Sequence, residues 1–202
     1  MIARTQALLQ KRFLTLYHYL ADILPYMVVR WDERYLHFVS ANRTMRKISP
    51  VMIVATYFGD GYLWGVIGLV ILILGSSLDR KYVMVGFAIT MINIALFRFL
   101  KAVFKRERPL YVAPLYDLRY RFLDSYSFPS GHATTSFAIA YVLGYFYPEW
   151  WVYLGVYGAA SLIAVSRIHV AEHYPSDVIA GALLGTLSAS FLIPIFERIF
   201  GL

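Results

Sequence analysis

Three short clusters of polar side chains interrupt an otherwise apolar chain of 202 residues. Each cluster lies where an apolar stretch meets a polar one. In chain order they are Lys101-x6-Arg108-Pro109, Pro129-Ser130-Gly131-His132 and Ser166-Arg167-x5-His173-x3-Asp177. Permanent cations, two imidazoles and a carboxylate are groups that can bind a phosphate and stabilise charge on a phosphoryl group in transfer. The clusters therefore predict a site for phosphoryl transfer, provided that the fold brings them together.

The basic side chains are suited to binding anionic oxygens. Arg108 and Arg167 can each bind two oxygens at once, and Lys101 supplies a compact point charge. On a helix, Arg98, Lys101, Lys105 and Arg108 recur at spacings of three and four and form one cationic stripe. Taken alone, the stripe would also fit a collar of long cationic side chains at a membrane surface.

The second cluster is expected to begin a helix. Backbone N–H groups at a helix N-terminus lack intrahelical partners and bind phosphate well. Ser130 could cap this helix and touch a phosphate oxygen, and Gly131 lets the backbone come close. His132 would stand in the first turn, where it could protonate a leaving oxygen. Read in isolation, the same residues also fit an ordinary turn followed by a structural histidine.

The third cluster places a histidine four residues before a carboxylate. Pro175 is expected to start a helix, with Asp177 in its first turn. A carboxylate there can hold one imidazole nitrogen of His173 and leave the other free to attack phosphorus. The two histidines would thus take two roles, His173 as the nucleophile and His132 as the acid.

A metal site is the alternative interpretation of the third cluster. His169, His173 and Asp177 at positions i, i+4 and i+8 could line one helix face. Pro175 argues against an unbroken helix through them, and a metal leaves the basic residues unexplained. We therefore predict neither a metal nor a cofactor, and a structural or interfacial role for His169. The chain has no cysteine, so neither thiolate ligands nor disulfides contribute.

Composition indicates an integral membrane protein. Hydrophobic residues make up 59% of the chain and aromatic residues 17%. The net charge of +7 comes from Lys and Arg that mostly flank apolar segments, which favours anionic lipid surfaces over nucleic acid as partners. No cleavage site for a signal peptide follows the basic N-terminus, so we expect it to be retained. One membrane-embedded domain is predicted over residues 1–202.

Apolar runs of nearly 20 residues, the length that crosses a bilayer, define the expected elements. We predict an all-α bundle of five or six transmembrane helices, at about 51–76, 82–103, 132–147, 150–166 and 177–196, with residues 12–30 as a poor span or an interfacial amphipathic helix. Tight hairpins are expected at Ser77–Lys81 and Tyr147–Trp151. Counting spans puts all three clusters on one face, together with the long loop 104–131.

One further ionisable residue falls near membrane depth. Asp60 lies between Gly59 and Gly61, close to the same face of the predicted bundle. Ionisable residues in such positions are candidates for function. For Asp60, we favour pairing with Arg98, or a role in interrupting the helix, over a part in catalysis.

The three clusters, in this order, resemble the signature of the type 2 phosphatidic acid phosphatase and vanadium haloperoxidase superfamily. The resemblance spans residues 101–177. It implies that His173 forms a phosphohistidine, that Asp177 orients it, and that His132 is first the acid and then the base for water. It also implies a phosphate site without a metal, formed by Lys101, Arg108, Ser130, Gly131 and Arg167.

The membrane branch of that family dephosphorylates lipid phosphates and polyprenyl diphosphates, with the site generally facing the periplasm or the exterior. The number of predicted spans favours this branch, and with it a multi-pass protein of the inner membrane. Undecaprenyl diphosphate, phosphatidylglycerophosphate, phosphatidic acid and lipid A 1-phosphate are the substrates that the resemblance implies. Two alternatives stay open, a non-catalytic lipid-phosphate binding or transport protein and a vanadate-dependent haloperoxidase.

The third cluster departs from the family pattern at one informative position. The family often has an aromatic residue and a glycine between the arginine and the histidine, where this chain has the segment 168–172. Glu172, directly before His173, would repel phosphate if it pointed inward. We therefore expect its side chain to point away from the site.

Overall fold

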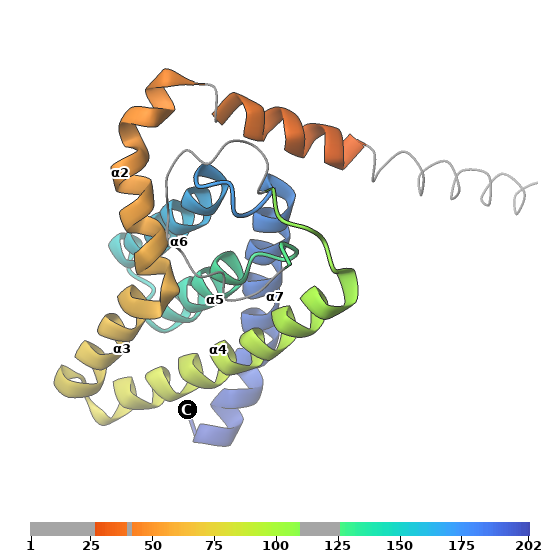
Figure 1. Ribbon diagram of the computed structural model, residues 1–202. Coiled ribbons are helices and arrows are strands. Elements are labelled where there is room, and N and C mark those ends of the chain that lie inside the picture. The colour runs from red at the N-terminus through yellow and green to blue at the C-terminus, as the bar shows by residue number, and fades with distance from the viewer. Residues whose placement is uncertain (1–26, 40–41, 110–125) are drawn as a thin grey trace, which may run out of the picture.

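A computed structural model of the chain describes residues 27–39, 42–109 and 126–202, and side chains in all of these except 43–46. Within these ranges every regular element is a helix and there is no strand (Figure 1). The predicted all-α class is thus confirmed. The segment 12–30, predicted as a span or an amphipathic helix, lies outside the described residues except for 27–30, which are helical.

A short helix over residues 27–39 precedes the labelled elements. These elements are α2 (Arg43–Tyr57), the π-helix η1 (Phe58–Tyr62), α3 (Leu63–Leu74), α4 (Ser77–Phe104), α5 (Gly131–Phe146), α6 (Trp150–His169) and α7 (Pro175–Phe200). Figure 1 shows α5 in the middle of the bundle, with α6 and α7 beside it and α4 crossing below.

Four described stretches are long and apolar enough to cross a membrane, namely Lys47–Leu74, Ser77–Phe104, Trp150–His169 and Pro175–Phe200. α5 has only 16 residues. Large apolar side chains stay exposed on the outside of the bundle, such as Leu74 at 80% and Phe191 at 74%, as expected where lipid is the solvent. A helical membrane bundle is therefore confirmed, whereas the predicted number of five or six spans is not.

The beginning of α4 differs from its prediction. The hairpin expected at Ser77–Lys81 is wrong, because these residues already form the first turn of the helix. Ser76 Oγ accepts a hydrogen bond from Asp79 N at 3.2 Å, and Asp79 Oδ2 accepts one from Ser76 N at 2.8 Å. This capping box satisfies two N–H groups at the helix start and fixes the turn just before it.

α5 and α7 approach each other closely because small residues face each other along their contact. A Cβ atom at Gly181 would lie 2.5 Å from Ser130 O, and one at Gly185 would lie 2.1 Å from Thr134 O. Ser130 N also donates to Asp177 O at 3.0 Å. These contacts dock the start of α5 directly against the start of α7.

The helix over residues 27–39 buries one face against the bundle. Asp32, Leu36 and Val39, at spacings of four and three, are buried, while their neighbours are exposed. Leu36 packs into an apolar cluster with Ala133, Ala164, Ile168 and Val178 from α5, α6 and α7. The helix therefore lies over the end of the bundle where α6 ends and α7 begins, at the top of Figure 1.

Candidate active site

Three basic side chains gather at one end of the bundle. Lys101 comes from the last turn of α4, Arg108 from the segment after α4, and Arg167 from the last turn of α6. They are only 4%, 7% and 2% exposed. All three line one cavity of about 640 Å³, together with Gly131, His132 and His173. The structure thus brings the three sequence clusters together on one face.

Glu172 does not point away from the site, so that expectation is wrong. Its side chain is 4% exposed and lines the same cavity. Its Oε2 atom accepts hydrogen bonds from Arg108 Nη1 at 3.1 Å and from Arg167 Nη2. Two buried guanidinium groups need a counter-charge, and Glu172 provides it.

His173 lies in the turn between α6 and α7 and is 1% exposed. Its Nδ1 atom lies 3.7 Å from Asp177 Oδ2. Burial, and then the positive charges of Arg167, Arg108 and Lys101, lower the pKa of His173 well below its ordinary value. The imidazole is therefore neutral at neutral pH, which is the form that can attack phosphorus.

Asp177 is fully buried and both of its carboxylate oxygens have donors. Oδ2 accepts from Tyr174 N at 2.9 Å, and Oδ1 accepts from Arg106 Nη1 at 2.7 Å. Its position in the first turn of α7 after Pro175 is the predicted one. The carboxylate is thus held in place from two sides beside His173.

His132 stands in the first turn of α5 and has a carboxylate partner. Its Nε2 atom lies 2.7 Å from Asp60 Oδ1. Asp60 belongs to the π-helix η1, whose residue Gly61 has a φ of 105°. A Cβ atom at Gly59 would lie 2.7 Å from His132 Cδ2, so only glycine lets the imidazole pack there. π-Helical turns often occur at functional sites.

Ser130 and Gly131 form the start of α5. Ser130 is the N-cap residue, and its side chain accepts from Ala133 N. It is fully buried and does not line the cavity, whereas Gly131 does. A Cβ atom at Gly131 would lie 3.0 Å from the ring of Phe97. The capping role predicted for Ser130 is observed, and the phosphate contact of both residues stays a prediction.

Arg106 was missed by sequence reasoning. Its guanidinium binds Asp177 and Asp32, at 2.7 Å in both cases. In the sequence it is one of several basic residues after α4, and nothing in the motif spacing separates it from Lys105. Its proximity to Arg108 was the only signal, and that signal does not identify its partners.

The metal interpretation finds no support in the helix geometry. α6 ends at His169 and α7 begins at Pro175, so the three residues His169, His173 and Asp177 do not lie on one helix. His169 Nε2 lies 2.8 Å from Ser49 Oγ of α2, in a buried contact. Among the residues that the structure describes, no three His, Cys, Asp or Glu side chains are grouped as metal ligands would be.

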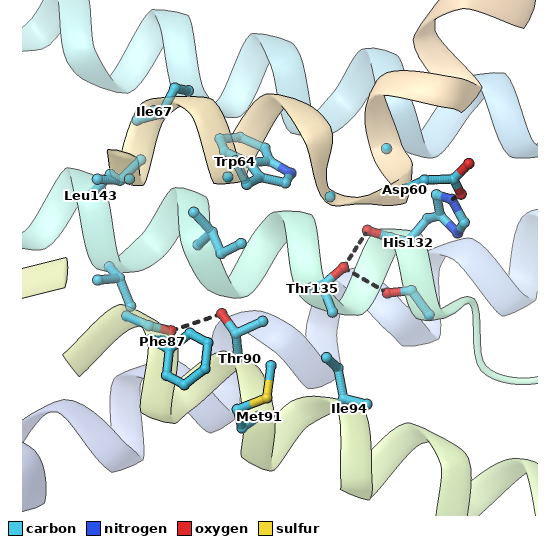
Figure 2. A pocket seen from close by; sticks show the side chains of 18 of the residues that line it. Asp60, Trp64, Ile67, Phe87, Thr90, Met91, Ile94, His132, Thr135 and Leu143 are labelled. Carbon is cyan, nitrogen blue, oxygen red and sulfur yellow. Dashed lines mark hydrogen bonds and ion pairs between the residues drawn. The ribbon is translucent and has the colours of Figure 1, made fainter. Parts of the chain in front are cut away.

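The cavity continues from the polar end into the apolar part of the bundle. Beyond Asp60 and His132 it runs between α3, α4 and α5 (Figure 2). Its apolar walls include Trp64, Ile67, Phe87, Met91, Ile94 and Leu143, and at the other end Tyr82 and Phe146. The cationic end and the apolar channel therefore form one continuous cavity.

Comparison with known proteins gives a family match. The family model described as the PAP2 superfamily matches residues 81–200. The undecaprenyl-diphosphatase of Sulfolobus acidocaldarius is 35% identical over 140 residues, which cover 69% of this chain and 66% of that protein. The chain thus spans slightly less than two thirds of this relative's length.

Two solved structures resemble the fold. The crystal structure of Aquifex aeolicus LpxE superimposes with a TM-score of 0.66 at 25% identity, over 80% of this chain and 93% of that one. The phosphatidylglycerolphosphate phosphatase of Bacillus subtilis, of PAP2 type, superimposes with a TM-score of 0.64 at 22% identity, over 92% and 96% of the two chains. At 22% identity, the second match supports a similar fold and nothing more.

Proposed function

Because this chain belongs to the PAP2 superfamily, we propose that it is an integral membrane phosphatase acting on a lipid phosphate or a polyprenyl diphosphate. One observation carries the proposal. The neutral imidazole of His173 lies beside a fixed carboxylate in a cavity lined by Lys101, Arg108 and Arg167, and that cavity continues into an apolar channel. Binding alone needs the cations but no nucleophile held by a carboxylate.

Substrate binding would replace the internal counter-charge of the arginines. The phosphate oxygens would bind Lys101, Arg108 and Arg167, while the carboxylate of Glu172 moves off the two guanidinium groups. Backbone N–H groups at the start of α5, beginning at Gly131, would donate further hydrogen bonds to the phosphate oxygens. The lipid chain would lie in the apolar channel between α3, α4 and α5.

The chemical step would proceed through a covalent phosphoenzyme. Because Asp177 faces Nδ1 of His173, the lone pair on Nε2 attacks phosphorus, and the bond between phosphorus and the leaving oxygen breaks. His132 gives a proton to that oxygen. Water then attacks the phosphohistidine, His132 takes a proton from it, and inorganic phosphate leaves with His173 restored. The carboxylate of Asp60, 2.7 Å from Nε2 of His132, would orient the ring for this proton transfer.

The cavity and one relative support the proposed substrate class. A continuous apolar channel next to an anion site fits an amphipathic phosphate whose tail stays in the bilayer. Similarity to the undecaprenyl-diphosphatase of Sulfolobus acidocaldarius makes undecaprenyl diphosphate the first substrate to test. Phosphatidylglycerophosphate, phosphatidic acid and lipid A 1-phosphate complete the panel. We further propose that the site faces the periplasm or the exterior of the inner membrane.

The test is phosphate release by the purified protein from this lipid panel, with and without a chelator. We expect turnover that the chelator does not reduce and that His173→Ala abolishes. His169→Ala is the control, because it removes an imidazole that contacts α2 and does not line the cavity. Binding without turnover on the whole panel would refute the proposal in favour of a lipid-phosphate binding protein. Loss of activity with the chelator would favour a metal mechanism.

A further inference from the structure

We propose that Asp32 is a positioning residue that holds the carboxylate of Asp177 in place through Arg106 and Ser176. The helix over residues 27–39 would then be a working part of the active site, although it lies far from the motifs in sequence. The inference deepens the proposed function and rests on it, because Asp177 is there the partner of the nucleophile.

Asp32 is a fully buried carboxylate that accepts hydrogen bonds from three donor atoms. Its Oδ1 atom accepts from Ser176 N at 2.9 Å. Its Oδ2 atom accepts from Ser176 Oγ at 2.5 Å and from Arg106 Nη2 at 2.7 Å. A buried carboxylate is costly unless it is paired and hydrogen-bonded. These bonds satisfy it, and they tie helix 27–39 to the first turn of α7.

Arg106 lies between two carboxylates and joins them. Besides its bond to Asp32, its Nη1 atom donates to Asp177 Oδ1 and to Ser176 Oγ, both at 2.7 Å. Its guanidinium carbon lies 4.1 Å from the centre of the Tyr174 ring, as in a cation–π contact. One planar group thus makes contacts on its edge and on its face, so its orientation is fixed.

The consequence for the nucleophile follows from charge and from geometry. Arg106 divides its single positive charge between Asp32 and Asp177. Without Asp32, the guanidinium would be drawn to Asp177 alone, and the turn at Ser176 would lose two bonds. The carboxylate would then turn towards Arg106 and away from His173 Nδ1, which already lies 3.7 Å from Oδ2. Small displacements of this kind cost up to about 100-fold in rate.

Two observations set this contact apart from the family site. Asp32 lies outside residues 81–200, the part of the chain that the family model matches. The buried face of its helix carries Leu36, which packs against the apolar cluster of α5, α6 and α7. The helix therefore docks by apolar packing, and Asp32 reaches the catalytic carboxylate from that docked position.

The experiment compares Asp32→Asn with Glu33→Gln. Both variants remove one negative charge from the same helix, but the Glu33 side chain is exposed and Asp32 is buried. For Asp32→Asn we expect kcat to fall about 10- to 100-fold with KM little changed, because the phosphate-binding cations are untouched. Glu33→Gln should match the wild type. A variant that merely unfolds would lower the active fraction, so active-site titration by trapping the phosphoenzyme accompanies the kinetics.

Two further measurements keep the inference falsifiable. In an Arg106→Gln background, Asp32→Asn should cost less than in the wild type, because only the contact through Ser176 is then left to lose. Hydrogen exchange of the segment 174–178 should rise in Asp32→Asn and not in Glu33→Gln, whether or not a substrate has been found. An Asp32→Asn enzyme with wild-type kcat, or with unchanged exchange at Ser176, would overturn the inference. Absence of turnover in the wild type would refute the proposed function instead, and the exchange data would still decide on the contact.

Discussion

The Nε2 atom of His132 lies 2.7 Å from Asp60 Oδ1, so each of the two histidines in the site has a carboxylate beside it. The two pairs come from different parts of the fold. His173 and Asp177 are four residues apart around the start of α7, whereas Asp60 reaches His132 from a π-helical turn 72 residues earlier. The first carboxylate would orient a nucleophile and the second would support an acid.

The Asp60 pair predicts a dependence on the leaving group. Asp60→Asn should lower kcat on a lipid phosphate by about 100-fold, because general acid catalysis contributes on the order of 10² to 10⁴. On p-nitrophenyl phosphate, whose leaving oxygen needs no proton, the loss should be small. Steady-state kinetics on both substrates measure the difference. An equal loss on both would show that Asp60 acts on the shape of the site and not on the acid.

Glu172 predicts an increase in phosphate affinity. Because its carboxylate occupies the guanidinium groups of Arg108 and Arg167, Glu172→Gln should lower the inhibition constant of inorganic phosphate by about tenfold, the effect of removing one modest competing charge interaction. Glu107→Gln removes the same charge from an exposed residue of a neighbouring segment and should have no effect. Weaker inhibition by phosphate in Glu172→Gln would mean that the carboxylate holds the arginines in their binding geometry.

The pH profile tests the charge state of His173. Attack requires the neutral ring, and burial followed by the positive charge of Arg167 lowers the pKa of His173 well below 6.5. The acidic limb of kcat/KM in the wild type should therefore lie below pH 6.5. Arg167→Gln removes a positive charge that opposes protonation, so the pKa rises and the limb moves to higher pH, on top of a loss in overall rate. A limb that stays in place would contradict the assignment of His173 as the titrating nucleophile.

Sequence patterns located the main motifs because those residues lie at helix ends, which hydropathy and proline mark well. The span pattern correctly put Lys101, His132 and His173 on one face, since each apolar run reverses the direction of the chain. The start of α4 was also readable, because Ser76 and Asp79 have the spacing of a capping box. Hydropathy alone starts this span only at about residue 82, because the residues just before it are charged.

Three features of the site could not be predicted from sequence. Glu172 turns inward because two buried arginines need a counter-charge, and a single sequence does not show which charges are buried together. Asp60 meets His132 only because the π-helical turn with Gly61 changes the register of the helix. Asp32 lies in a segment of mixed polar and aromatic residues, where its burial depends on docking against α7.

The apolar channel makes a prediction about chain length. Gly65 of α3 lines the cavity and has open space around the position of a Cβ atom. Gly65→Trp should therefore fill part of the channel near Trp64, which Figure 2 shows facing that space. Gly158→Trp on α6 is the matched control, because that glycine has equally open surroundings and does not line the cavity.

We expect Gly65→Trp to raise KM for undecaprenyl diphosphate about tenfold, the cost of losing burial of roughly two methylene groups. The same substitution should leave KM for p-nitrophenyl phosphate unchanged. Equal kinetics of the two variants on the long substrate would show that the lipid tail lies elsewhere, whereas a loss on both substrates would show that the tryptophan disturbs the phosphate site.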